Sequence, residues 1–308
     1  MKKYSLKILF FISLFTLSAV CLSCTPLSAS KLDLSDSASW HYLKTFWQIK
    51  DYPIVFIHGI AGGFSDWQKT ADIISDHHTY EMRFLDKDKI YHNYYGKKPK
   101  IWVWNVSYYT IFSLEESFTG YLDLYAERLK QMIAVIKQIT GSDKVVICAH
   151  SMGGLIARKY MSMDQQCWDS VYKVLTVATP HQGVGTSFYI VGQLRDLRPE
   201  SEFIKNLNTD WLKFDTGPIK KWGVIAGLIS SETITDKIDG IATDGAGIGY
   251  VTLSSAIPFK EWKDALEYSM ESPSYNTLHF GFRRIIRASH VALLTHPHVL
   301  EGIRWAVR

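Results

Sequence analysis

Residues 144–154 read KVVICAHSMGG, an apolar run that leads directly into Ser151 and two glycines. Residues 144–149 have the length and composition of a strand buried on both faces of a parallel sheet, and residues 152–163 are expected to form a helix. A serine between such a strand and a helix is typical of a nucleophile elbow, whose backbone is strained. The residues two before and two after the serine must then be small, as Ala149 and Gly153 are.

The alternation of strands and helices continues on both sides of this turn. Apolar runs at residues 52–58, 101–107, 171–178 and 222–228 predict strands, and residues 121–140 have the apolar spacing of a long amphipathic helix. Such alternation indicates βαβ units and a parallel sheet. No internal repeat or linker is evident, so residues 30–308 are expected to form one α/β domain.

The alternation is interrupted once, beyond Pro180. Residues at about 185–220 mix irregular segments with helical turns and include several aromatic side chains. Because the carboxyl edge of a parallel sheet is where α/β active sites lie, we expect this segment to be a cap over Ser151. Trp211, within the cap, is a candidate substrate-binding residue, but a cap also needs a small core of its own, and its aromatic side chains fit either role.

The first residues have the pattern of an export signal. Residues 1–29 contain three lysines and no acid, and residues 8–22 form an apolar run too short to span a membrane comfortably. Small residues before Ser30 would suit an ordinary signal peptidase, whereas Cys24 after Leu22 and Ser23 resembles a lax lipobox with a lipidated cysteine. Both alternatives predict an exported protein, either secreted, periplasmic or anchored by lipid at the cell envelope.

Composition excludes several other classes of protein. The net charge of +4 comes largely from the three lysines of residues 1–29, so the rest of the chain lacks the charge of a nucleic-acid-binding protein. Beyond that segment only Cys148 and Cys167 remain, and we expect two free thiols rather than a zinc site. The glycine-rich residues 245–249 lack the spacing of a nucleotide-binding loop.

The hexapeptide 149–154 (AHSMGG) in its strand–turn–helix setting resembles the α/β-hydrolase superfamily and, within it, secreted bacterial lipases and esterases. Residues 58–63 (HGIAGG) look like the oxyanion loop of that family. The resemblance implies an α/β-hydrolase fold, a mostly parallel central sheet with helices on both faces and a helical cap. It also implies an oxyanion hole formed by the backbone N–H groups of Ile60 and Met152. His58, Gly59 and His150 join Trp211 as candidate substrate-binding residues.

A serine nucleophile needs a base and an acid that orients the base, and in this family the acid lies between the serine and the histidine in sequence. Residues 239–256 (DGIATDGAGIGYVTLSSA) resemble the acid loop of secreted lipases. The resemblance points to Asp244 as the acid. Asp239 is its rival and Asp236 a more distant one.

Five histidines are candidates for the base. His181 precedes every candidate acid and lies in a TPHQG turn that looks like a structural or cleft-lining element of the family. His290 begins the sequence HVALL, which resembles the family's base loop, and is the residue we predict. The others are His279, His296 and His298, and the last two are expected at the surface before the final helix.

These features predict a serine hydrolase that cleaves carboxylic, lipid-like esters through an acyl-enzyme and needs no cofactor. Its expected partner is an ester or lipid substrate, met at a membrane or lipid interface, and not a nucleic acid. The same triad could serve a thioesterase, an amidase or an acyltransferase. A surface binding protein that retains the fold with a dead site is the alternative outside enzymes.

Overall fold

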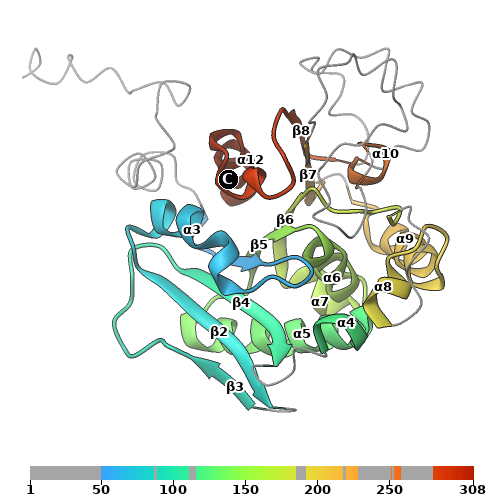
Figure 1. Ribbon diagram of the computed structural model, residues 1–308. Helices are drawn as coiled ribbons and strands as arrows, with labels where there is room; N and C mark the ends of the chain where they lie inside the picture. Colours follow the sequence, from blue (N-terminus) through green and yellow to red (C-terminus); the bar gives the residue numbers. More distant parts are fainter. Residues whose placement is uncertain are drawn as a thin grey trace, which may run out of the picture. The chain divides into compact units, whose positions relative to one another are not determined.

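The computed structural model describes residues 50–86, 89–110, 116–184, 192–217, 220–227, 251, 253–257 and 280–308. Within them eight strands form one sheet in the order β3-β2-β4-β1-β5-β6-β7-β8 (Figure 1). Every neighbouring pair is parallel except β2 and β3. The mostly parallel sheet with helices is the predicted fold class. The export segment, residues 1–29, lies outside the described residues.

The strands and helices alternate along the chain as the sequence predicts. The strands are β1 (Ile54–Ile57), β2 (Thr79–Asp86), β3 (Lys89–His92), β4 (Val103–Thr110), β5 (Val145–His150), β6 (Val171–Val177), β7 (Trp222–Gly227) and β8 (Phe282–Ile286). The α-helices are α3 (Gln68–Ser75), α4 (Glu116–Thr119), α5 (Leu122–Thr140), α6 (Met152–Met161), α7 (Gln165–Asp169), α8 (Gly192–Asp196), α9 (Glu202–Phe214), α10 (Leu253–Ala256) and α12 (Pro297–Val307). Two short 3-10 helices, η2 (Phe64–Trp67) and η5 (Ala292–Thr295), precede α3 and α12.

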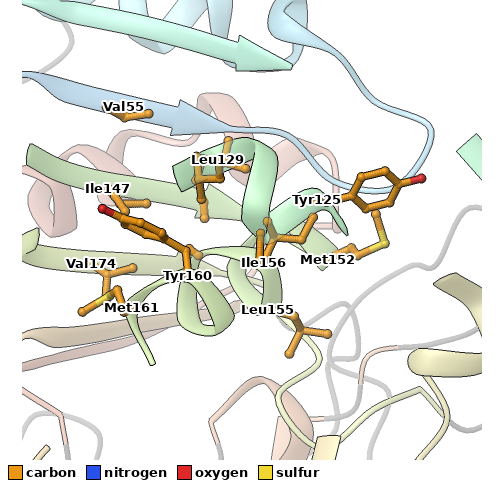
Figure 2. Packing of buried hydrophobic residues seen from close by; sticks show 14 of the residues in the cluster. Val55, Tyr125, Leu129, Ile147, Met152, Leu155, Ile156, Tyr160, Met161 and Val174 are labelled. Atoms are coloured by element: carbon orange, nitrogen blue, oxygen red, sulfur yellow. The ribbon is translucent and has the colours of Figure 1, made fainter. Parts of the chain in front are cut away.

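The central strands are buried on both faces, which explains their continuous apolar sequences. Alternate residues of β1 face opposite helical layers: Val55 belongs to the core cluster that includes side chains of α5 and α6, whereas Phe56 stacks on Trp67 at a ring distance of 4.9 Å. Figure 2 shows the first layer, in which Ile147 of β5 and Val174 of β6 accompany side chains from α5 and α6. Helices α3 and α12 pack against the other face (Figure 1).

Three strands at the ends of the sheet were not predicted. β2 and β3 form one edge, and β8 forms the other. β3 has no fully buried side chain, and β8 (FRRII) carries two arginines. Strands that are solvated in part need not be apolar throughout, so their sequences lack the signal that identifies the central strands.

The described part of the expected cap contains α8 and α9. The buried residues of α9 are Phe203, Ile204, Leu207 and Trp211, and the helix packs on α6 (Figure 1). Residues 185–191 and 218–219 lie outside the described residues. No helix among the described residues is long and apolar enough to cross a membrane. Cys148 and Cys167 are both buried free thiols, as predicted.

Candidate active site

Ser151 occupies a strained turn between β5 and α6. Its backbone has φ 52° and ψ −130°, a conformation that residues with a side chain rarely adopt. The turn is held at both sides: the Ser151 N–H donates to the Val177 carbonyl at 2.9 Å, and the Ser151 carbonyl accepts from the Gly154 N–H at 3.0 Å. This is the geometry expected of a nucleophile elbow.

Glycines allow two backbone segments to meet at this turn. A methyl group at Gly153 would lie 2.3 Å from the His58 carbonyl oxygen, and one at Gly59 would lie 2.9 Å from the Ser151 Cβ. Neither position has room for a side chain. The segment after β1 therefore packs directly on the serine turn, as an oxyanion loop must.

Two tyrosines at the end of β4 hold this loop. The Tyr108 hydroxyl donates to the Gly59 carbonyl at 2.9 Å, and the Tyr109 hydroxyl accepts from the Ala61 N–H at 3.3 Å. Tyr109 also donates to Gln193 of α8 at 3.2 Å, which links the loop to the segment after residue 191.

His58 lies behind the loop and not in the cavity beside Ser151. It is 1% exposed, and its ring stacks on Tyr108 at a centroid distance of 4.1 Å. Its Nδ1 donates to the Gly59 carbonyl at 2.7 Å, which leaves Nε2 to accept from the Ser107 hydroxyl at 3.1 Å. Burial lowers the pKa of His58 to about 4, so the ring is neutral near pH 7. The expectation that His58 binds substrate is therefore corrected: its contacts support the loop.

A cavity of about 390 Å³ opens above Ser151. It combines apolar side chains with a few polar groups, the pattern typical of small-molecule sites. Its lining comprises Gly59, Ile60, Ala61, Gly62, Asp66, His150, Ser151, Met152, Pro180, Val184, Leu197, Val251, His290, Val291 and Leu294.

The two residues predicted to form the oxyanion hole both line this cavity. Met152 is the first residue of α6, so its N–H is one of those that have no acceptor within the helix. The positive end of the helix macrodipole adds to this donor. Ile60 faces the same space from the loop after β1. Negative charge that develops on a substrate oxygen beside Ser151 would lie close to Met152 and Ile60.

His290, the predicted base, also lines the cavity, in the turn between β8 and η5. Its backbone carbonyl lies 3.0 Å from Nε2 of His150, and the two rings are 4.5 Å apart between centroids. Because a carbonyl can only accept, Nε2 of His150 carries the proton. Burial, and to a lesser extent charge on His290, lowers the pKa of His150 well below its ordinary value. His150 is therefore a neutral donor that ties the serine turn to the His290 turn.

Three other base candidates, His181, His296 and His298, lie within the described residues and have different surroundings. His181 is fully buried between the Arg158 guanidinium, 3.2 Å from its Nδ1, and the Thr176 hydroxyl, 3.0 Å from its Nε2. His296 caps α12 by accepting from the His298 N–H. None of the three lines the cavity. His279 and the candidate acids Asp244, Asp239 and Asp236 lie outside the described residues.

Trp211 lies in the packing of α9 and not in the cavity. It is 2% exposed, and its ring contacts Trp168 and Trp222 at centroid distances of 4.9 and 5.0 Å. The Arg158 guanidinium lies 5.0 Å from its centroid. The structure therefore does not bear out Trp211 as a substrate-binding residue, because its surface is covered by other core aromatics. Among the described residues, Leu197 of the expected cap and Val184 just before it do reach the cavity.

Sequence reasoning missed Asp66 and the two tyrosines that hold the oxyanion loop. Asp66 lines the cavity beside Ser151, although it is not among the candidate site residues of the sequence. Its position just after HGIAGG is the only signal that could have found it. The tyrosines follow the predicted strand 101–107, and nothing local distinguishes them from core aromatics.

Comparison with known proteins finds similar sequences over about half of this chain. A family model described as a PGAP1-like alpha/beta domain matches residues 48–195. A GPI inositol-deacylase of Candida albicans is 32% identical over 141 residues, which cover 44% of this chain and 33% of that protein. A triacylglycerol lipase of Pseudarthrobacter phenanthrenivorans is 30% identical over 135 residues, covering 43% of this chain and 34% of that protein. The matched region is thus about a third of the length of each of these relatives.

Solved structures resemble the chain over a larger share of its length. The crystal structure of a Listeria innocua gene product aligns with a TM-score of 0.54 at 17% identity, over 83% of this chain and 94% of that one. At this identity the likeness speaks for the fold alone. Together with the parallel sheet and the serine turn, it identifies the fold of the α/β hydrolases. The chain is a member of this fold class and is similar in sequence to a PGAP1-like domain, a GPI inositol-deacylase and a triacylglycerol lipase.

Proposed function

We propose that this protein is a serine hydrolase that cleaves carboxylic esters of lipid-like molecules. The observation that carries the proposal is the convergence of Ser151, His290, Ile60 and Met152 on one cavity, with Ser151 in a strained elbow. A serine is a weak nucleophile unless a base and oxyanion donors are placed beside it. Such a convergence is what acyl transfer requires.

In the proposed mechanism Ser151 Oγ attacks the acyl carbonyl while His290 removes its proton. The N–H groups of Ile60 and Met152 stabilise the oxyanion, each by about 3 kcal/mol. His290 then returns the proton to the leaving alcohol, and an acyl-enzyme forms. Water, activated by the same histidine, releases the acid. Asp244, as the proposed acid, orients the His290 ring, and Gly59 leaves the acyl carbonyl room to approach Ser151.

The acyl preference is inferred from the cavity wall and the relatives. The cavity lining includes apolar side chains suited to an acyl chain, those of Pro180, Val184, Leu197, Val291 and Leu294. The names of the similar proteins describe an inositol-deacylase and a triacylglycerol lipase. Both names support an acyl ester as the substrate of this chain. Both also support hydrolysis at a site in contact with lipid.

The same residues suit three alternative reactions: hydrolysis of thioesters, hydrolysis of amides and transfer of the acyl group to another alcohol. A binding protein without activity is the alternative outside catalysis. A panel of p-nitrophenyl esters of rising chain length, combined with a serine-reactive fluorophosphonate, separates them. We expect labelling and ester turnover in the parent, and loss of both in Ser151→Ala at unchanged thermal stability.

Ser142→Ala serves as the control for this substitution, because Ser142 lies in the turn between α5 and β5, away from the cavity. It should keep both labelling and turnover. Ester turnover by Ser151→Ala close to that of the parent would contradict the elbow assignment. Labelling of the parent without turnover of any ester would favour one of the alternative reactions.

We also propose that residues 1–29 direct export and that Cys24 carries a lipid anchor. An anchor would keep the enzyme near lipid substrates. The lipidated protein should partition into the detergent phase, and Cys24→Ser should move it to the aqueous phase. An unmodified mature protein beginning at Ser30, identified by mass spectrometry, would refute the anchor and leave export standing.

A further inference from the structure

A single carboxylate faces the cavity among the described residues that line it. It belongs to Asp66, in η2, just after the oxyanion loop. Apart from the two histidines, the other described lining residues are apolar or neutral, and none of them is a lysine or an arginine. Apolar side chains, among them Pro180, Val184 and Leu294, line the same cavity as this carboxylate and Ser151. The cavity therefore offers apolar contacts for an acyl chain and a charged acceptor for a polar group.

The local contacts of Asp66 use only part of its hydrogen-bonding capacity. Its Oδ1 accepts from the Gly63 N–H at 3.3 Å, a long bond that caps η2. Its Oδ2 lies against Gly62, where an added methyl carbon would be 2.2 Å away, and Gly62 itself lines the cavity. No ion pair with a described lysine or arginine involves this carboxylate. Burial raises the pKa of Asp66, and the Gly63 N–H opposes this effect.

A negative charge on Asp66 disfavours the hydrolysis of an ester whose alcohol part carries no hydrogen-bond donor. Acyl transfer builds negative charge on the oxyanion near Ile60 and Met152, and a carboxylate in the same cavity opposes that charge. Capping of η2 does not require a charge, because the amide oxygen of an asparagine at position 66 would accept from the Gly63 N–H equally well. A group in the substrate that donates hydrogen bonds to Asp66 would offset the repulsion.

We propose that Asp66 binds a free hydroxyl group in the alcohol part of the substrate, so that the enzyme prefers acyl esters of polyols to esters of simple alcohols. The inference rests on the proposed ester hydrolysis and names its substrate class. A carboxylate accepts from a hydroxyl in a charge-assisted bond, which is roughly twice as strong as a neutral one. The alcohol part of an ester bound at Ser151 lies in the same cavity as this carboxylate.

The test compares two soluble esters of the same acid, 1-monobutyrylglycerol and ethyl butyrate. Asp66→Asn keeps an oxygen for the Gly63 N–H and removes the charge. We expect the ratio of kcat/KM for the glycerol ester to that for the ethyl ester to fall about fivefold in this variant. Asp143→Asn, which removes the same charge from an exposed turn, should leave the ratio unchanged.

Three outcomes would overturn the proposal. Equal losses of kcat/KM on the two esters would mean that Asp66 only shapes η2 and the oxyanion loop. Unchanged kcat/KM values on both esters would mean that no substrate hydroxyl contacts Asp66. A selective loss on butyrylcholine, measured as a third ester, would assign Asp66 to a cationic head group instead.

A binding experiment separates this proposal from the proposed ester hydrolysis. In the Ser151→Ala background, ligand-observed NMR should detect 1-monobutyrylglycerol more strongly than ethyl butyrate, and Asp66→Asn should abolish the difference. This result would support the hydroxyl site even if the parent hydrolysed neither ester, an outcome that contradicts only the hydrolysis. Equal signals from the two esters before the substitution would overturn the hydroxyl site while leaving the hydrolysis intact.

Discussion

The Nε2 atom of His150 donates to the backbone carbonyl of His290 across 3.0 Å, and this bond joins two turns that are 140 residues apart in the chain. His150 precedes the proposed nucleophile, and His290 is the proposed base. Both are held in the wall of the same cavity. The spacing between nucleophile and base is therefore controlled by a side chain that, in the proposed mechanism, transfers no proton itself.

We expect His150→Leu to lower kcat by about tenfold to a hundredfold, because small displacements of a reacting group have effects of this size. KM for short esters should change little. His150→Gln, whose amide N–H can reach a similar point, should recover part of kcat. Steady-state kinetics over a pH series measure both variants, and the apparent pKa assigned to His290 should shift in the leucine variant alone. A uniform loss in both variants with lowered thermal stability would indicate a packing role only.

Buried histidines should make the fold sensitive to acid. Burial lowers the pKa of His58 to about 4 and lowers those of His150 and His181 well below the ordinary value. The unfolded chain takes up protons below about pH 6.5, whereas the folded state does not, so stability is complete above that pH and is lost as the pH falls. For His58 the loss by about pH 4 is on the order of 3 kcal/mol.

Urea unfolding at several pH values between 7 and 4.5 measures this dependence. His58→Gln should flatten the curve, while His78→Gln, at an exposed position, should not. An unfolding free energy that stayed constant from pH 7 to 4.5 would show that these rings protonate in the folded state.

The packing of the oxyanion loop on the serine turn predicts a strong effect of one methyl group. Gly153→Ala would place its Cβ 2.3 Å from the His58 carbonyl oxygen. The loop must then move, and we expect a loss of about 1 to 3 kcal/mol in stability and a larger fractional loss in ester turnover. Gly63→Ala is the matched control, because nothing lies within 4 Å of the added carbon. Wild-type activity in Gly153→Ala would contradict the close approach.

The surroundings of Trp211 predict that its removal affects stability and not chain-length preference. Trp211→Ala should lower the free energy of unfolding by about 3 to 5 kcal/mol, because a buried aromatic side chain leaves a cavity. Leu212→Ala, on the exposed side of the same helix, should change it by less than about 0.5 kcal/mol. The relative rates on acetate and long-chain esters should match those of the parent. A selective loss on long chains would restore Trp211 to the substrate site.

Local sequence determined the central part of the fold and the serine turn. Residues 144–154 contain a buried strand, a small residue on either side of the serine and a helix, and each requirement is met within a few residues of Ser151. The five strands of the sheet centre were predictable for the same reason, since burial on both faces demands continuous apolar runs. Edge strands, which meet water, leave no such pattern.

Tertiary structure decided which side chains face the cavity. His58, His150 and Trp211 were all candidate substrate-binding residues by sequence, yet His58 supports the oxyanion loop, His150 both lines the cavity and holds the His290 turn, and Trp211 packs within the core. Asp66 also reaches the cavity, and its place just after HGIAGG is its one local signal. The physical reason is that a helix or strand is specified by the spacing of its own residues, whereas the direction and partners of a side chain depend on segments that pack against it from distant parts of the chain.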